Sequence, residues 1–181
     1  MNVFIKGEGM PKVIENVREQ LLREAERQIK EVGYAKTTIR SVAGACGLGV
    51  GTVYNYFSSK DMLVASFMLE DWQRILAKMK SCSSDNPYKA LLSIYDSLTE
   101  FLSMHKELFS DRDAEKRFGV SHTEYHKMLR GQLADIIRTV LRKAGENTVF
   151  LSEFVAESLL TWTVEGKSFD EIYCILESII K

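Results

Sequence analysis

Residues 37–63, TTIRSVAGACGLGVGTVYNYFSSKDML, decide the fold of this chain. Two threonines precede a short apolar run, and threonine is a favoured N-cap because its hydroxyl accepts a bond from a free helix N–H. Gly47 and Gly49 then interrupt the pattern, as a tight turn requires, because glycine adopts positive φ without strain. Ser58 and Asp61 resemble a capping box that opens a longer helix. The stretch predicts two short helices around a glycine-containing turn, followed by the start of a third.

The sequence on both sides of this stretch is also helical in pattern. Gly33 stands where a left-handed C-cap would end the preceding helix, and segment 110–117 is a charged helix or loop expected to be solvated. The chain has two prolines and lacks alternating Val, Ile and Thr runs bounded by turns, which predicts an all-α fold. Apolar residues at steps of three and four predict helices over about 12–32, 60–80, 88–104, 122–144, 149–165 and 169–180.

Length and charge limit what the chain can be. With 181 residues, 45% of them hydrophobic, it can form a small domain and a larger one, and we place these at residues 1–62 and 63–181. The net charge is −1, and residues 1–62 carry nine basic against seven acidic side chains. This excess permits a local basic surface but argues against binding driven mainly by charge.

Several sequence features point to a soluble protein of a reducing cytoplasm. No apolar run is long enough to span a membrane, and the N-terminus lacks the pattern of a secretory signal. The three cysteines are far apart and odd in number, so they form no disulfide or metal framework.

Residues from about Val13 to Leu69 resemble the DNA-binding domain of TetR/AcrR-type bacterial transcriptional regulators. Two departures stand out: Gly49 replaces a residue that is commonly Ser or Thr, and Gln28 occupies a first-helix position that is usually apolar. The matching elements occur in order at fixed spacing: Ala25, Gly33-Tyr34, Thr37-Thr38, Val42-Ala43, Gly47-Leu48, Gly51-Thr52-Val53-Tyr54, Tyr56-Phe57 and Ser59-Lys60-Asp61-Met62-Leu63.

The resemblance implies a helix-turn-helix domain whose second helix enters the major groove of a double-stranded DNA operator. It assigns phosphate contacts to Thr38, Thr52, Tyr56 and Lys60. The free N–H groups at the reading end, residues 49–52, would also favour phosphate. Candidates for base readout are Arg40, Val50, Gly51, Tyr54 and Asn55, with Gly49 capping the reading helix.

Other readings of these residues remain open. Tyr54 and Tyr56 are either DNA contacts or core aromatics, and Arg40 is either a guanine contact or a solvated charge. Val53 and Phe57 are expected in the core. Gly44 and Gly51, poor residues in a helix interior, are expected to serve close packing or the close approach of a partner.

The resemblance implies that the body, residues 63–181, forms a homodimer through its last two long helices and binds a small hydrophobic effector. Packing within a single subunit is the alternative for these helices, and plain core packing is the alternative for the aromatics. The expected dimer contacts are Leu133, Ile137, Val140, Leu141, Phe154 and Leu159. The expected pocket residues are Phe67, Trp72, Tyr95, Phe101, Phe109, Phe118 and Trp162.

The sequence offers no support for an enzyme. GLGVGT lacks the GxxxxGK[ST] pattern and the preceding strand of a phosphate loop. His122 and His126 share one helical face at a spacing that can hold a metal, but a solvated pair is the simpler reading, and no metal or cofactor is expected. The function expected is that of a ligand-responsive transcriptional repressor released from a palindromic operator. A small helical enzyme or a ligand carrier that does not bind DNA is the rival.

Overall fold

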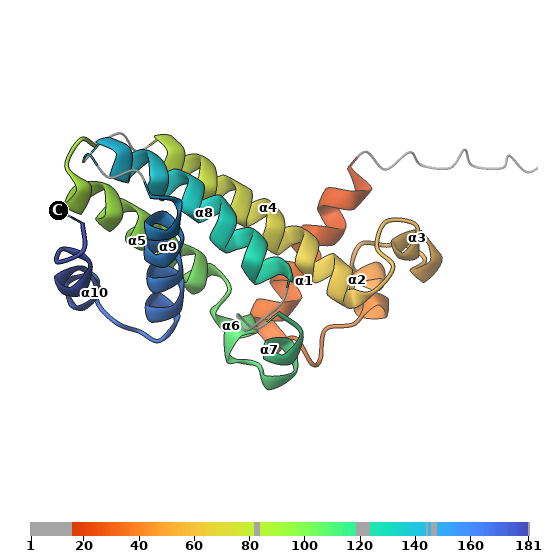
Figure 1. The fold of residues 1–181 in the computed structure, drawn as a ribbon. Coiled ribbons are helices and arrows are strands. Elements are labelled where there is room, and N and C mark those ends of the chain that lie inside the picture. Colours follow the sequence, from red (N-terminus) through yellow and green to blue (C-terminus); the bar gives the residue numbers. More distant parts are fainter. Residues whose placement is uncertain (1–15, 82–83, 119–123, 144, 146–147, 181) are drawn as a thin grey trace, which may run out of the picture.

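The computed structural model describes residues 16–81, 84–118, 124–143, 145 and 148–180, which form helices and connecting turns with no strand (Figure 1). This confirms the all-α class. The helices are α1 (Val17–Val32), α2 (Ile39–Ala45), α3 (Val50–Tyr54), α4 (Lys60–Ser81), α5 (Pro87–Met104), α6 (Lys106–Ser110), α7 (Arg112–Phe118), α8 (Glu124–Lys143), α9 (Val149–Val164) and α10 (Phe169–Leu176).

Two local expectations need correction, and a third holds with one exception. Gly33 has a positive φ of 84°, but its ψ of 164° lies outside the left-handed helical region, although its N–H still bonds to the Ile29 carbonyl. Ser59 rather than Ser58 caps α4, because the Ser59 hydroxyl accepts from the N–H of Met62 at 3.1 Å. Segment 110–117 is exposed at most of its described positions, as expected, but Ala114 of α7 is completely buried.

Two hydrophobic clusters hold the fold together, and α4 contributes to both. The N-terminal cluster joins α1, α2 and α3 to the first half of α4 and to α6 and α7. Its buried members are Leu21, Leu22, Ala25, Ile29, Tyr34, Ile39, Val42, Ala43, Val53, Phe57, Leu63, Val64, Phe67, Leu108 and Ala114. The boundary at residue 62 stays a prediction, although side chains from beyond it complete this cluster.

The body cluster joins the second half of α4 to α5, α8, α9 and α10. Trp72 lies at its edge toward the N-terminal cluster, 1% exposed, and donates from Nε1 to Oε1 of Gln132 on α8 at 2.8 Å. Figure 1 shows α4 and α8 running side by side, with α2 and α3 at one end of the molecule and α10 at the other. Because α4 is one unbroken helix, a change in the body can reach the N-terminal helices through it.

A buried polar pair lies where the two clusters meet. Nε2 of His105, which follows α5, is 3.1 Å from Oδ2 of Asp71 on α4, and both side chains are almost fully buried. The imidazole stacks on Phe67 of the N-terminal cluster and meets Phe101 of the body cluster edge-on. This contact and the α6–α7 segment supplement α4 in joining the two parts.

Candidate nucleic-acid interface

The two short helices α2 and α3 are fixed by their caps and by the glycine turn between them. Thr38 caps α2: its Oγ1 accepts from the N–H of Ser41, and the Ser41 hydroxyl accepts from the N–H of Thr38, each at 3.0 Å. Gly47 has a φ of 67°, and the next residue, Leu48, donates to the Ala43 carbonyl at 2.8 Å. The chain reverses within four residues and starts α3 at Gly49 without a side-chain cap.

The structure places most of the expected DNA contacts at the surface. Thr38, Arg40, Gly49, Gly51, Tyr54, Asn55 and Tyr56 are exposed, whereas Val50, Thr52 and Lys60 are half-buried. Val50 packs its side chain against the N-terminal cluster, which leaves less of it available for a base. Whether each residue touches DNA stays a prediction, but all except these three stand open to a partner.

The alternating aromatic segment 53–57 resolves one open question. Val53 and Phe57 lie inside the N-terminal cluster at 0% and 3% exposure, as expected. Tyr54 and Tyr56 lie outside it at 54% and 47%, so the reading that made them core aromatics is wrong. A five-residue helix has only one face to bury, and Val53 occupies it.

The glycines of this region are not explained by packing inside the chain. A methyl group added at Gly44 or Gly51 would meet no atom within 4 Å, and one at Gly49 would meet only the Thr52 hydroxyl at 3.9 Å. Of the two reasons expected for Gly44 and Gly51, close packing is therefore wrong, and room for a partner remains.

The basic side chains of this part differ in whether they have partners. On α1, Arg23 pairs with Glu19, Arg27 with Glu24 and Glu31, and Lys30 with Glu26, and Arg18 pairs with Glu70 of α4. Among the described residues, Lys36 and Arg40 have no carboxylate partner, and both are exposed beside Thr38. Positive charge that is not neutralised within the chain therefore gathers at the start of α2. Lys36 is not among the DNA contacts predicted from the sequence.

Lys60 is held by the chain itself. Its Nζ donates to the Tyr34 carbonyl at 2.9 Å and lies 3.7 Å from the centre of the Tyr34 ring. The Tyr34 hydroxyl in turn donates to Asp61. Lys60 thus ties the start of α4 to the loop before α2, and a phosphate contact would have to share its ammonium group with that carbonyl.

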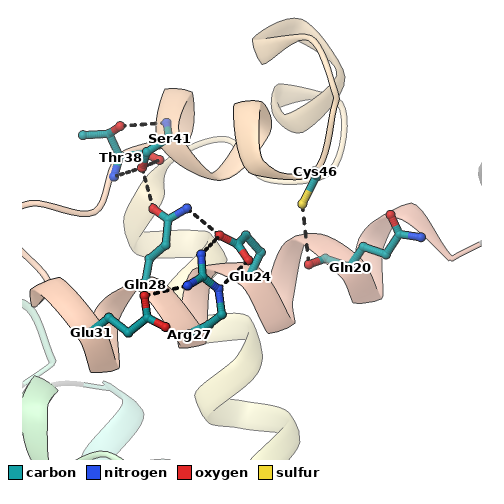
Figure 2. A network of polar contacts seen from close by, with 8 residues as sticks. All are labelled: Gln20, Glu24, Arg27, Gln28, Glu31, Thr38, Ser41 and Cys46. Carbon is teal, nitrogen blue, oxygen red and sulfur yellow. Dashed lines mark hydrogen bonds and ion pairs between the residues drawn. The ribbon is translucent and has the colours of Figure 1, made fainter.

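A polar network crosses from α1 to α2 next to the Thr38 cap. In Figure 2, Gln28 of α1 lies between Glu24 on its own helix and Ser41 at the start of α2. Nearby, Cys46 lies against the Gln20 carbonyl, and burial raises the pKa of its thiol, so the thiol stays protonated at neutral pH.

Comparison with known proteins identifies this part of the chain. Residues 21–67, which contain α1 to α3 and the start of α4, match the model of the tetR family of bacterial regulatory proteins. The chain is 36% identical over 82 residues to the HTH-type transcriptional regulator BetI of Stenotrophomonas maltophilia. Residues 21–67 therefore form a DNA-binding domain of the TetR family type. Over 72 residues it is 38% identical to the HTH-type transcriptional repressor Rv1474c of Mycobacterium tuberculosis. The names of these relatives agree with the expectation that this chain is no enzyme.

These matches concern one part of each relative. The alignments cover 44% and 38% of this chain, and the chain spans less than half the length of either relative, 42% and 38%. Among solved structures, a TetR/AcrR regulator from Thermobifida fusca aligns over 91% of this chain and 96% of its own, with a TM-score of 0.62 at 16% identity. The fatty acid degradation regulator FadR of Bacillus halodurans has the same coverage and a TM-score of 0.56. These structures support the overall fold.

In the body, four of the six expected dimer contacts are buried within the chain itself. Leu133, Ile137, Leu141 and Leu159 are at most 1% exposed because α8 and α9 pack against α4 and α5 of the same chain. A side chain with no accessible surface has no area left to bury against a partner. Val140 is half-buried and Phe154 is exposed. The apolar surface instead follows α9 and α10: Val149, Phe150, Phe154, Trp162, Val164, Ile175 and Ile179 are exposed.

The expected pocket aromatics do not surround one cavity in the described part of the chain. The Trp72 ring packs against the Phe101 ring, with centroids 5.3 Å apart, and the Phe101 ring packs against the Phe109 ring, with centroids 6.4 Å apart. Phe67 belongs to the N-terminal cluster, Tyr95 bonds to the Lys167 carbonyl at 2.9 Å, and the Phe118 side chain lies outside the described residues. Trp162 lines a cavity of about 310 Å³ between α9 and α10.

The two remaining expectations concern metals and membranes. His122 lies outside the described residues, and Nε2 of His126 is 3.1 Å from a carboxylate oxygen of Glu157 on α9. Among the described residues, no three His, Cys, Asp or Glu side chains gather as a metal site would need. No described helix has the length and apolar character needed to cross a bilayer.

Proposed function

We propose that this chain is a cytoplasmic, ligand-responsive transcriptional repressor of the TetR family that binds a near-palindromic DNA site as a homodimer. The observation that carries the proposal is the surface around α2 and α3, where Arg40 and Lys36, beside the exposed Thr38, have no carboxylate partner in the part of the chain that the structure describes. Phosphate contacts need positive charge and hydroxyl donors at the surface, and both are gathered here. Tyr54 and Asn55 stand on the exposed side of α3, where a reading helix meets base edges.

The dimer in this proposal forms through the exposed face of α9, which α10 extends. Phe150 is 75% exposed although it is one of the largest apolar side chains of the body. Together with Phe154 and Trp162 it gives an apolar surface at helical spacing, which marks an interaction site in a protein of this size. A two-fold axis would set two reading helices one turn of DNA apart, about 34–36 Å.

Release from DNA follows if a small hydrophobic effector changes the distance between the two reading helices. Helix α4 is the proposed lever because it buries Leu63, Val64 and Phe67 in the N-terminal cluster and Trp72 and Ile75 in the body cluster. A tilt of α4 by a ligand in the body would move α2 and α3 of each subunit. A ligand shifts the equilibrium between two tilts of α4 only if it binds one of them more tightly than the other.

Fluorescence anisotropy with DNA from upstream of the protein's own gene tests the proposal. The expected result is salt-sensitive binding to a short palindrome, about 1,000-fold or more tighter than to unrelated DNA. The double variant Arg40→Ala/Tyr54→Ala changes only exposed side chains, so it should keep the wild-type melting temperature and lose specific binding. Adding candidate apolar ligands to the complex then tests release. A folded protein without salt-sensitive DNA binding would overturn the proposal and favour a carrier or a small enzyme.

A further inference from the structure

Gln28 is a polar side chain at a position that is usually apolar in the family. It lies on α1, is 9% exposed, and makes hydrogen bonds at both ends of its amide. Figure 2 shows these bonds as one path from Glu24 through Gln28 to Ser41 and the Thr38 cap. A buried amide that is hydrogen-bonded at both its nitrogen and its oxygen fixes the geometry of the groups that it joins.

The direction of these bonds is set at Glu24. Hydrogen bonds from Arg27 lower the pKa of Glu24 despite the opposing effect of burial, and a bond from Gln28 adds to this, so Glu24 is ionised at neutral pH. An ionised carboxylate can only accept hydrogen bonds. The Gln28 amide must therefore turn its NH2 group to Glu24, 2.7 Å away, and its oxygen toward the Ser41 hydroxyl, 2.6 Å away.

The Ser41 hydroxyl links Gln28 to the backbone of Thr38. It donates its proton to the Gln28 oxygen and accepts the N–H of Thr38 at 3.0 Å. The N–H of Ser41 then donates to Oγ1 of Thr38 at 3.0 Å. This oxygen accepts one bond, and its own hydrogen meets no acceptor among the described residues, so Thr38 has a hydroxyl hydrogen left to donate at an exposed position.

We propose that Gln28 is a positioning residue for DNA binding: through Ser41 it holds the Thr38 hydroxyl as an outward donor to a backbone phosphate. The inference rests on the proposed function, because it needs a phosphate at this surface. Contacts of this kind set the register of the protein on DNA and are independent of the base sequence. Gln28 itself touches no DNA, since it lies on α1 behind the cap.

The test is the variant Gln28→Met, which keeps the length of the side chain and a high helix propensity. The fold should hold, because the Ser41 hydroxyl can turn to the Thr38 carbonyl at 2.9 Å and Glu24 keeps its bonds to Arg27. Affinity should fall about three- to tenfold, equally for operator and unrelated DNA, as expected for one neutral hydrogen bond. The salt dependence should stay the same because no charge is removed.

A double-mutant cycle with Thr38→Val separates positioning from general stability. If Gln28 acts through the Thr38 hydroxyl, Gln28→Met has no further effect on affinity once that hydroxyl is gone. Ser41→Ala breaks the same path from the α2 side and should reproduce the loss, which keeps the test valid if Gln28→Met unfolds. Gln73→Met, at an exposed position of α4, is the control and should bind like the wild type.

Two results would overturn the inference. One is wild-type DNA affinity in both Gln28→Met and Ser41→Ala. The other is a double variant Gln28→Met/Thr38→Val whose loss of affinity equals the product of the two single losses. A wild-type protein that binds no DNA would instead overturn the proposed function, so the two failures are distinguishable.

Discussion

Exposed aromatic side chains occur in both parts of the molecule, but their surroundings differ. In the N-terminal part, Tyr54 and Tyr56 stand out from α3 and the turn after it, and the same part carries Lys36 and Arg40, which have no carboxylate partner among the described residues. In the body, Phe150 and Trp162 stand out from α9 among other apolar residues. A polar ring beside positive charge suits a nucleic-acid surface, whereas a stripe of purely apolar groups suits another protein surface. One chain thus offers two surfaces of different chemistry.

The largest effect should separate core from surface within the body, using its two tryptophans. Trp72→Ala should lower the free energy of unfolding by about 3–5 kcal/mol, because Trp72 is 1% exposed and packs edge-on against Phe101. Trp162→Ala should change the stability of the monomer by less than about 0.5 kcal/mol. Urea denaturation followed by circular dichroism, at a protein concentration where both variants are monomeric, measures both values. Equal losses in the two variants would contradict the burial of Trp72.

The second prediction concerns the apolar stripe of the body. Phe150→Lys/Phe154→Lys should weaken the dimer by at least about 100-fold, because large side chains at the centre of an interface each contribute about 2 kcal/mol or more. Sedimentation velocity over a dilution series measures the dissociation constant. Val32→Lys, at an exposed apolar position of α1, is the control and should leave the dimer intact. Unchanged association in the double variant would remove α9 from the interface.

The third prediction tests base readout in the N-terminal part. Arg40→Ala should cost about 1–3 kcal/mol of binding to the operator and relax the preference at one base pair. Its stability should stay that of the wild type, since the side chain is exposed and has no carboxylate partner among the described residues. Competition with operators altered at single positions provides the measurement. An equal loss on every sequence would assign Arg40 to a phosphate instead.

The smallest expected effect distinguishes two lysines near the Thr38 cap. Lys36→Ala and Lys60→Ala should each weaken binding to all sequences and lower the slope of log affinity against log salt by about one unit. Lys60→Ala should also lower the melting temperature, because Lys60 holds the Tyr34 carbonyl, whereas Lys36→Ala should not. An unchanged salt slope in Lys60→Ala would restrict Lys60 to its structural contact with Tyr34.

Local signals predicted the N-terminal part well for a physical reason. The Thr38 cap, the Gly47 turn and the inward Val53 and Phe57 depend on neighbours within a few residues, so the sequence contains what is needed to infer them. The Gln28 network could be noticed as a departure from the family pattern, but not interpreted. Its partner Ser41 is 13 residues away and becomes a neighbour only when α1 and α2 pack.

The body was harder to predict because apolar residues are spread around the whole circumference of α9. Leu159 and Phe154 both look like interface residues in the sequence, yet one is 0% exposed and the other 41%. Periodicity indicates that a helix has an apolar face, but a helix without a polar side gives no direction. The same ambiguity made Leu133, Ile137 and Leu141 of α8 look available to a partner when they are part of the body cluster.

By itself, the sequence determined the all-α class, the helix-turn-helix with its Thr38 cap and turn, and the resemblance of this part to TetR-family DNA-binding domains. These follow from local backbone preferences and from a motif with fixed spacing. Only the tertiary structure decided which cations lack partners, which apolar face stays exposed, and how Gln28 reaches the Thr38 cap. Each of these depends on side chains brought together from distant helices, and the packing that joins them is a property of the whole fold.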